Sequence, residues 1–183
     1  MLTSEQLIAT LTTNFSSALI AQSDFRNELT CIIKKEFLLP VCTFLRDDAE
    51  LQFDSLRDIT AVDYLGFEET SGASYNHDTN IPHRSSYEYD ERFQIVYNLY
   101  SFKNNFRLRL KILLNDGEHV LTVSTVWQAA NWYERETYDM FGIQFDEHPD
   151  LRRMYLPEEF EYHPLRKEFP LMGIPGSLPL PRH

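Results

Sequence analysis

Hydrophobic and polar residues alternate along two stretches of the chain, residues 93–100 and 106–112. A period of two predicts β-strands, and the turn-forming residues 103–105 between them predict an antiparallel hairpin. One side of each stretch is apolar and the other polar, which indicates a sheet with one covered face. Shorter stretches rich in strand-forming residues predict further strands at residues 17–23, 29–33 and 59–66.

Three other stretches carry apolar residues at helical spacing. Residues 6–15, which follow Ser4, predict a short amphipathic helix. Residues 36–47 predict a second helix, with Pro40 near its first turn, where a missing N–H is best tolerated. The third and longest is residues 126–141, whose expected buried stripe comprises Val126, Ala129, Ala130, Tyr133, Thr137, Met140 and Phe141.

The ends of this third helix also carry signals. Thr125 followed by Gln128 fits an N-terminal capping box, and Gly142 stands where a left-handed C-terminal cap belongs. The helical period places Arg135 and Asp139 on the polar face, four residues apart, where they are expected to form an ion pair.

Two pairs of side chains on the same helix bear on function. Glu134 and Glu136 lie about 200° apart around the helix, so they cannot act as a close pair of catalytic carboxylates. Trp127 and Trp132 both fall outside the buried stripe. Two interpretations remain open for them: a protein–protein interface, or burial beneath the segment that follows the helix.

The order of helices and strands predicts an α+β fold. We expect a two-layer core domain over residues 1–142, with packing helices on a mixed, largely antiparallel sheet. Within it, residues 68–90 are a polar insertion, either disordered or used for docking. Seven of the nine prolines lie between Pro149 and Pro181, so residues 143–183 are expected to form a long, extended, proline-rich C-terminal arm and tail.

Composition excludes several classes of function. A net charge of −11 and a pI near 4.9 argue against nucleic-acid binding, because no basic surplus exists to neutralise phosphates. Cys31 and Cys42 form no metal or redox motif, and they indicate small buried side chains in a reducing compartment. The apolar runs are too short to span a bilayer, and residues 1–10 resemble no targeting signal. We therefore expect the chain to start at Met1 and to reach a membrane only through partners.

Few side chains suggest chemistry of their own. His148 and His163 could contribute to a metal site, but each precedes proline and more simply fixes an extended turn. Arg107, Arg109 and Lys111 form a basic stripe, either paired with acids on a neighbouring strand or exposed for an acidic partner. No glycine-rich phosphate loop or cysteine cluster occurs, so no cofactor is expected on the chain.

The chain resembles a known family at Glu134-Arg135-Glu136, Asp139-Met140-Phe141, His148, Arg152 and Met154-Tyr155. These residues and spacings are similar to the signature of the thirty-kilodalton subunit of respiratory complex I (NADH–quinone oxidoreductase). The resemblance extends to residues 58–65, 93–99 and 163–170. It covers most of residues 28–170, but not residues 67–90 or the last dozen.

The resemblance implies a non-catalytic structural subunit within a proton-pumping enzyme. Its implied partners are other complex I subunits, chiefly the large subunit that forms much of the quinone site, which we call the large quinone-site subunit, and the iron–sulfur subunits near that site. We expect the chain to be the form that is not fused to this large partner. Flavin, iron–sulfur clusters and quinone are expected on the neighbours. The implied location is peripheral to the membrane, on its cytoplasmic side, or on the matrix side in an organelle.

The residues that carry the family signature or the expected interface lie on the third helix and the arm. They are Glu134, Arg135, Glu136, Asp139, Phe141, Gly142, His148, Pro149, Leu151, Arg152, Arg153, His163, Pro164, Leu165, Arg166, Lys167, Phe169 and Pro170. We expect Glu134, Arg135, Glu136 and Asp139 to position the chain, through ion pairs to the arm or to a partner, rather than to catalyse. The arm, residues 143–170, is expected to bind the main partner and to be unnecessary for folding.

Two other functions remain open from the sequence. The equivalent small subunit of a related membrane-bound hydrogenase, or of a quinone reductase with another donor, would share the Glu134-Arg135-Glu136 motif. A free-standing hydrolase using acidic residues near positions 134–150 is disfavoured, because the helix separates its carboxylates.

Overall fold

The computed structural model describes residues 2–26, 28–65 and 91–173. The expectations for residues 68–90 and for the tail beyond Gly173 fall outside these ranges. In chain order the elements are α1 (Ser4–Asn14), β1 (Leu19–Phe25), β2 (Glu28–Ile33), the short 3-10 helix η1 (Lys35–Phe37), α2 (Leu38–Asp47), β3 (Ser55–Asp63), β4 (Phe93–Ser101), β5 (Phe106–Leu114), β6 (His119–Leu121), α4 (Ala130–Phe141) and β7 (Gln144–Asp146).

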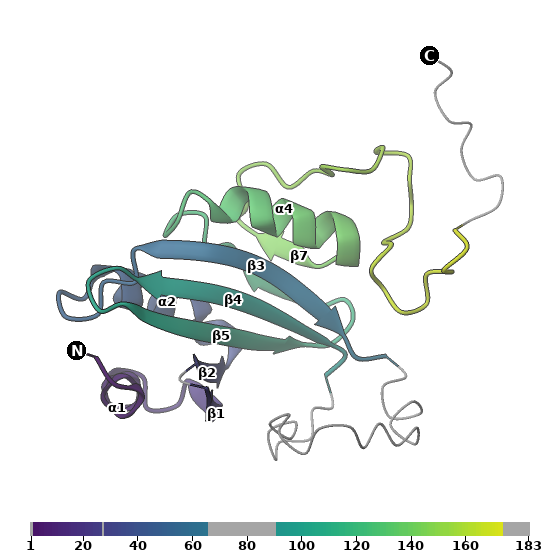
Figure 1. Cartoon of the computed structure of the whole chain (residues 1–183). Coiled ribbons are helices and arrows are strands. Elements are labelled where there is room, and N and C mark those ends of the chain that lie inside the picture. Colours follow the sequence, from purple (N-terminus) through teal and green to yellow (C-terminus); the bar gives the residue numbers. More distant parts are fainter. Residues whose placement is uncertain (1, 27, 66–90, 174–183) are drawn as a thin grey trace, which may run out of the picture.

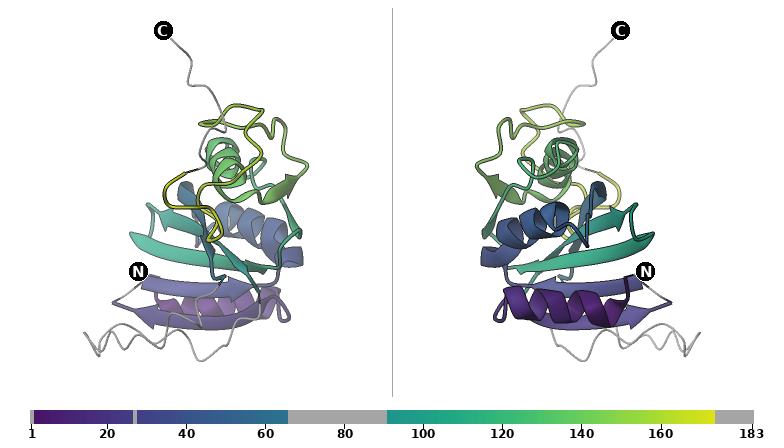
Figure 2. Two further views of the ribbon diagram at one scale, coloured as in Figure 1. Left: turned by 90° about the vertical axis from the view of Figure 1, so that its right-hand side faces the viewer. Right: turned by 90° about the vertical axis from the view of Figure 1, so that its left-hand side faces the viewer.

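Five strands form the main sheet, in the order β1-β2-β5-β4-β3. Strands β4 and β5 form the predicted antiparallel hairpin, which runs from the pair Phe93–Leu114 to the pair Ser101–Phe106. Only β2 and β5 are parallel within this sheet, so the mixed, mostly antiparallel α+β fold is confirmed among the described residues. The helices α1 and α2 lie against one face, and α4 lies over β3 (Figures 1 and 2).

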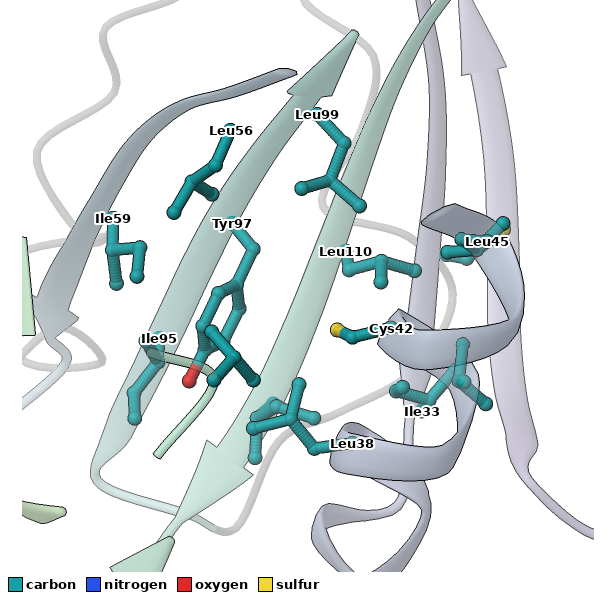
Figure 3. Close-up of a cluster of buried hydrophobic side chains, with 14 of the residues drawn as sticks. Ile33, Leu38, Cys42, Leu45, Leu56, Ile59, Ile95, Tyr97, Leu99 and Leu110 are labelled. Carbon is teal, nitrogen blue, oxygen red and sulfur yellow. The ribbon is translucent and has the colours of Figure 1, made fainter. Parts of the chain in front are cut away.

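The core fills the space between the sheet and these helices. Figure 3 shows Tyr97 and Leu110 of the sheet reaching toward Cys42 and Leu38 of α2, and all four are buried. Both cysteines are free and buried, as the sequence indicated. Burial raises the pKa of the Cys31 thiol to about 12, so that this thiol stays protonated and unreactive near neutral pH.

In the basic stripe, on the opposite face of the sheet, Arg107 and Arg109 pair with an acid on a neighbouring strand, the first of the two interpretations. Glu28 on β2 lies 3.4 Å from Arg107 and 3.1 Å from Arg109, which are side by side on the neighbouring strand β5. The cross-strand pairing is therefore confirmed. Since Arg107 is exposed and the Arg109 and Glu28 side chains are partly exposed, the pairs contribute little to stability.

The third predicted helix begins later than its sequence pattern suggested. It starts at Ala130 rather than at residue 126, and its N-cap, Ala129, makes no side-chain capping bond, so the predicted Thr125–Gln128 box is wrong. The backbone N–H groups of Val126 and Trp127 instead donate to the Val123 carbonyl in a preceding turn. The C-terminal prediction is confirmed, because Gly142 adopts the left-handed conformation with φ 75°.

Trp127 is buried, which corrects the interpretation that places it at a protein–protein interface. Its side chain is only 5% exposed, and the indole Nε1 donates to the Phe53 carbonyl at 3.0 Å. A tryptophan buried in the core with its N–H paired is a packing residue, not an interface residue. Ala129, expected in the buried stripe, is exposed in the same turn.

Other boundaries shift by a few residues. Strand β3 covers Ser55–Asp63 rather than residues 59–66, and the helix α1 is capped by Thr3, which forms a capping box with Gln6. The expectation that the core strands end at Gly142 is also wrong. Strand β7 pairs in parallel with β6, and Phe145 joins the hydrophobic core with 3% exposure.

Candidate functional site

The residues after β7 turn back onto the helix α4. We call residues 147–173 the C-terminal segment; it contains turns and extended stretches but no helix or strand. In Figure 1 it passes over α4 and descends beside the helix's C-terminal end. Most of the signature residues identified from the sequence lie in this contact between helix and segment.

Asp139 on α4 holds the segment by its carboxylate. One oxygen, Oδ2, accepts hydrogen bonds from three successive backbone N–H groups, those of Met154 (3.0 Å), Tyr155 (2.7 Å) and Leu156 (3.1 Å). The other, Oδ1, lies 2.7 Å from the Arg153 guanidinium. Burial opposes ionisation, but these hydrogen bonds outweigh it and hold the pKa of Asp139 below its usual value. Asp139 is therefore a charged anchor for the segment.

The C-terminal end of α4 supplies a second set of bonds. The last carbonyls of a helix have no partner within the helix and must find one elsewhere. Here the segment provides partners for three of them: the His163 ring bonds the Asp139 carbonyl at 2.9 Å, the Leu165 N–H the Met140 carbonyl at 3.1 Å, and the Arg166 Nε the Phe141 carbonyl at 2.6 Å. The segment thus caps the helix.

Gly142 permits this close approach. A Cβ at position 142 would lie 2.6 Å from the His163 ring and 3.0 Å from the Arg166 guanidinium. The positive φ of 75° is also unfavourable for other residues. Both the conformation and the available space therefore require glycine here.

Asp63 at the end of β3 is a second buried carboxylate bound to the segment. It accepts from Arg92 through Nε (3.1 Å) and Nη2 (2.9 Å), and from the backbone N–H groups of Leu65 (3.0 Å) and Lys167 (2.9 Å). Burial opposes ionisation, but Arg92 and these N–H groups keep the pKa of Asp63 below its usual value. Arg92 also pairs with Glu168, so this cluster joins the end of β3 and the residue before β4 to the segment.

Glu134 behaves differently from these two aspartates. It is fully buried, and its carboxylate accepts from the Val123 N–H at 2.7 Å and from the Thr122 hydroxyl. Burial raises the pKa of Glu134 to about 7, because the two hydrogen bonds offset only part of the desolvation. The Nε2 atom of His148 is 3.7 Å away. Glu134 fixes the turn that precedes α4 to the helix itself.

His148 is a neutral side chain in this arrangement. Its Nδ1 accepts from the Asp150 N–H at 3.0 Å, so the proton belongs on Nε2, which donates to the Asn131 carbonyl at 3.2 Å; this tautomer is assigned from the hydrogen bonds. Burial lowers the pKa of His148. The side chain therefore staples the start of the segment to α4 without carrying charge at neutral pH.

Arg135 does not form the predicted ion pair with Asp139. Its guanidinium donates to the carbonyls of Arg152 (3.2 Å) and Arg153 (3.3 Å), and it stacks 5.0 Å from the Trp132 ring. The predicted polar face of the helix is buried because the segment covers it. Trp132 itself remains 59% exposed.

The remaining signature residues are nearer the surface. Glu136 is half-buried on α4 and makes no ion pair or hydrogen bond with any described residue. Arg152 is exposed and lies 3.0 Å from Asp150. Leu151 packs against the core, Pro164 is half-buried, Phe169 is partly buried in a cluster of aromatic rings, and Pro149, Lys167 and Pro170 are exposed.

Sequence reasoning missed Asp63, Arg92 and Thr122 as parts of this site. Asp63 carried a signal, because it continues the apolar side of its strand after Ile59 and Ala61. An acid on the buried side of a strand implies a partner. Nothing in the sequence marks Thr122, whose role depends on a turn between elements.

The buried acids of the site hold the chain's own groups in place. The carboxylates of Asp139, Asp63 and Glu134 each accept hydrogen bonds from the chain itself. Among the described residues no group of three or more His, Cys, Asp or Glu side chains could hold a metal ion. The site is thus a device that fixes the C-terminal segment on α4.

The described part of the chain contains no helix that is long and apolar enough to cross a membrane.

A solved structure has a fold similar to that of this chain. A chain from the structure of the membrane-bound sulfane sulfur reductase (MBS), described as an archaeal respiratory membrane complex, has a TM-score of 0.65 and 20% identity, with 92% of this chain and 86% of that chain covered. At this identity the likeness shows the fold alone.

Sequence relatives are more informative. A protein of Geotalea uraniireducens, named as a subunit of NADH-quinone oxidoreductase, is 40% identical over 174 residues, which cover 94% of this chain and 92% of the relative. The protein of the same name from Geobacter metallireducens is 39% identical over 180 residues, covering 98% and 96%. Residues 31–175 match the family described as respiratory-chain NADH dehydrogenase, 30 Kd subunit, and the chain belongs to this family.

Proposed function

We propose that the chain is a non-catalytic structural subunit in the peripheral arm of a proton-pumping NADH–quinone oxidoreductase, with other subunits of that complex as its partners. Family membership supports this proposal, as do relatives that are named as subunits of the enzyme and match over nearly their full length. The site agrees with it, because its buried acids hold the chain's own backbone.

The chief partner we propose is the large quinone-site subunit, and the docking element is the C-terminal segment. One observation carries this proposal: the polar groups of the segment bond to α4 and β3, while several of its large apolar side chains face solvent. Exposed fractions are 62% for Tyr155, 47% for Tyr162, 53% for Leu165, 104% for Leu171 and 95% for Met172. Apolar groups held outward on a fixed backbone suit a protein interface.

The proposal assigns the redox chemistry to neighbouring subunits. Flavin, iron–sulfur clusters and quinone would be bound by those subunits. The iron–sulfur subunits around the quinone site would lie near this chain. The chain would then sit peripherally on the membrane through its partners, on the cytoplasmic side, or on the matrix side in an organelle.

The equivalent small subunit of a related membrane-bound hydrogenase, or of a quinone reductase with another donor, stays a second candidate. Such a subunit would share the Glu134-Arg135-Glu136 motif, which is the reason for keeping it. The subunits that accompany the chain distinguish the two.

The first experiment purifies the tagged, full-length chain from solubilised membranes of its own source and identifies the accompanying subunits. We expect the large quinone-site subunit, the iron–sulfur subunits and NADH–quinone reductase activity. Hydrogenase subunits in their place would support the second candidate. A chain that purifies alone from active membranes would contradict both.

The second experiment measures binding of the purified chain to the separately purified large quinone-site subunit. Removing residues 143–183 is a poor test, because it deletes β7 and leaves the buried Asp139 without its partners. Point substitutions avoid this. Tyr155→Ala with Leu165→Ala should weaken binding at least tenfold, while Phe102→Ala, at an equally exposed aromatic in the β4–β5 turn, should not. Equal affinities would place the interface elsewhere.

A further inference from the structure

Three aromatic rings of the C-terminal segment form a cluster at the surface. The ring centroids of Phe160 and Tyr162 are 5.6 Å apart, those of Phe160 and Phe169 6.3 Å, and those of Tyr162 and Phe169 6.4 Å. Tyr162 is 47% exposed, and the other two are partly exposed. We call these residues the aromatic triad. Such a group presents a compact apolar knob, with rings in mutually favourable tilted and edge-to-face arrangements.

The backbone beneath the triad is fixed at each ring. The Phe160 N–H donates to the Pro157 carbonyl at 3.0 Å, and the Phe169 N–H donates to the Arg166 carbonyl at 3.1 Å. Arg153, which also pairs with Asp139, donates to the Tyr162 carbonyl at 3.2 Å. A knob ordered before binding loses little conformational entropy when a partner covers it.

Exposed acidic residues are the sequence neighbours of Phe160 in this triad. Glu158, Glu159 and Glu161 flank Phe160 and are all exposed. None of the three forms an ion pair or hydrogen bond with a described residue, whereas Glu168, just before Phe169, pairs with Arg92 and Arg166. The rim on the Phe160 side therefore carries three negative charges that the described residues leave uncompensated.

We infer that the aromatic triad docks into an apolar recess on a neighbouring subunit whose rim carries arginine or lysine. This inference rests on the proposed function and adds the chemistry of the contact. The rings supply the buried centre of the interface, where aromatic residues contribute most of the binding energy. The three glutamates increase the association rate by attraction to the basic rim, an effect that salt weakens.

The same charges disfavour two other occupants. An anionic membrane surface would repel the acidic rim. A second copy of the chain would bring two acidic rims together, on proteins that each carry a net charge of −11. A basic protein surface is the occupant that the charges fit.

The test follows association and dissociation rates of the full-length chain with the separately purified large quinone-site subunit from the same source, over a range of salt concentrations. Tyr162→Ala should raise the dissociation rate about tenfold, as expected for a central aromatic contact. Glu159→Gln with Glu161→Gln should lower the association rate severalfold at low salt and flatten its salt dependence, with the dissociation rate nearly unchanged.

A matched control carries the same change of charge elsewhere. Glu5→Gln with Glu36→Gln neutralises two exposed glutamates that also lack ion pairs among the described residues, on α1 and η1. The association rate of this control should be much closer to that of the wild type than the rate of the rim variant is. Unfolding midpoints of all variants verify that they are folded, and the glutamate variants test the rim even if Tyr162→Ala is destabilised.

The outcomes separate the two proposals. Wild-type binding with unchanged rates in both triad and rim variants would overturn this inference and leave docking on the large quinone-site subunit intact. Equal rate effects of the control and rim variants would overturn the charge argument. A wild-type chain that fails to bind this partner would overturn both proposals, and tight binding to vesicles of phosphatidylglycerol would point to the membrane instead.

Discussion

The two sides of α4 are stabilised by different interactions. The side that faces the sheet packs Ala130 and Phe141 into the hydrophobic core, and it depends on apolar area. The other side is polar and almost as well buried, because the C-terminal segment covers Arg135 and Asp139. Apolar contacts tolerate small changes in shape, whereas a buried charge that loses its partners is costly. The comparison indicates that the stability of the apolar side depends on the area it buries, whereas the polar side, which also fixes the position of the segment, depends on every partner being in place.

The largest effect is expected from breaking the polar side at its centre. Asp139→Ala leaves three backbone N–H groups and the Arg153 guanidinium without their acceptor. We expect a loss of about 3–5 kcal/mol in the free energy of unfolding, measured by urea denaturation. Met140→Ala, at the next, half-buried position, is the control and should cost less. A loss below about 1 kcal/mol for Asp139→Ala would mean that solvent replaces the segment easily.

Gly142 tests how closely the segment must approach the helix. Gly142→Ala should cost about 2–4 kcal/mol, because it combines backbone strain with a clash against the His163 ring. Gly117→Ala has a similar φ of 80° but nothing within 4 Å, so it should show the strain alone, about 1–2 kcal/mol. The double variant Gly142→Ala with His163→Ala should cost less than the sum of its parts. Strict additivity would contradict the close contact.

Glu134 makes the stability of the folded chain depend on pH. Its folded pKa of about 7 lies above the ordinary value of 4.5, so the folded chain binds more protons than the unfolded chain between these values. Stability from this group is therefore present at low pH and falls as pH rises from about 4.5 to 7. Glu134→Gln removes the ionisation and can still accept the Val123 N–H.

Near pH 5 we expect the thermal unfolding midpoint of Glu134→Gln to equal that of the wild type or to lie slightly below it. At pH 8 the variant should be more stable, by on the order of 2–3 kcal/mol. Thermal unfolding of both proteins across this pH range measures the difference. A difference that does not change with pH would show that Glu134 ionises normally.

The smallest effect on folding, with a distinct effect on assembly, is expected at Glu136. This half-buried carboxylate has no partner among the described residues, so Glu136→Ala should change the free energy of unfolding by no more than about 0.5 kcal/mol. We expect it nonetheless to lower the amount of assembled complex in membranes. Normal assembly with abolished turnover would indicate that Glu136 has a catalytic role instead.

The elements with local patterns could be predicted from the residues alone. The alternation in β4 and β5 and the turn between them set the hairpin, and Gly142 set the end of α4, because these depend on neighbouring residues. The Glu134-Arg135-Glu136 and Asp139-Met140-Phe141 motifs also sufficed to identify the family, since the spacing of a signature is a property of the sequence.

What those polar residues do depends on how the elements pack. Arg135 and Asp139 fit an exposed ion pair by helical spacing, yet both are buried and bonded to the segment some 15 residues later. Trp127 likewise fell outside the predicted buried stripe, because the prediction treated it as helical although it precedes the helix. Its partner is the Phe53 carbonyl. Periodicity shows which faces of one element are apolar; it carries no information about which distant backbone will satisfy a buried charge. That choice is made when the elements pack and every buried polar group must find a partner.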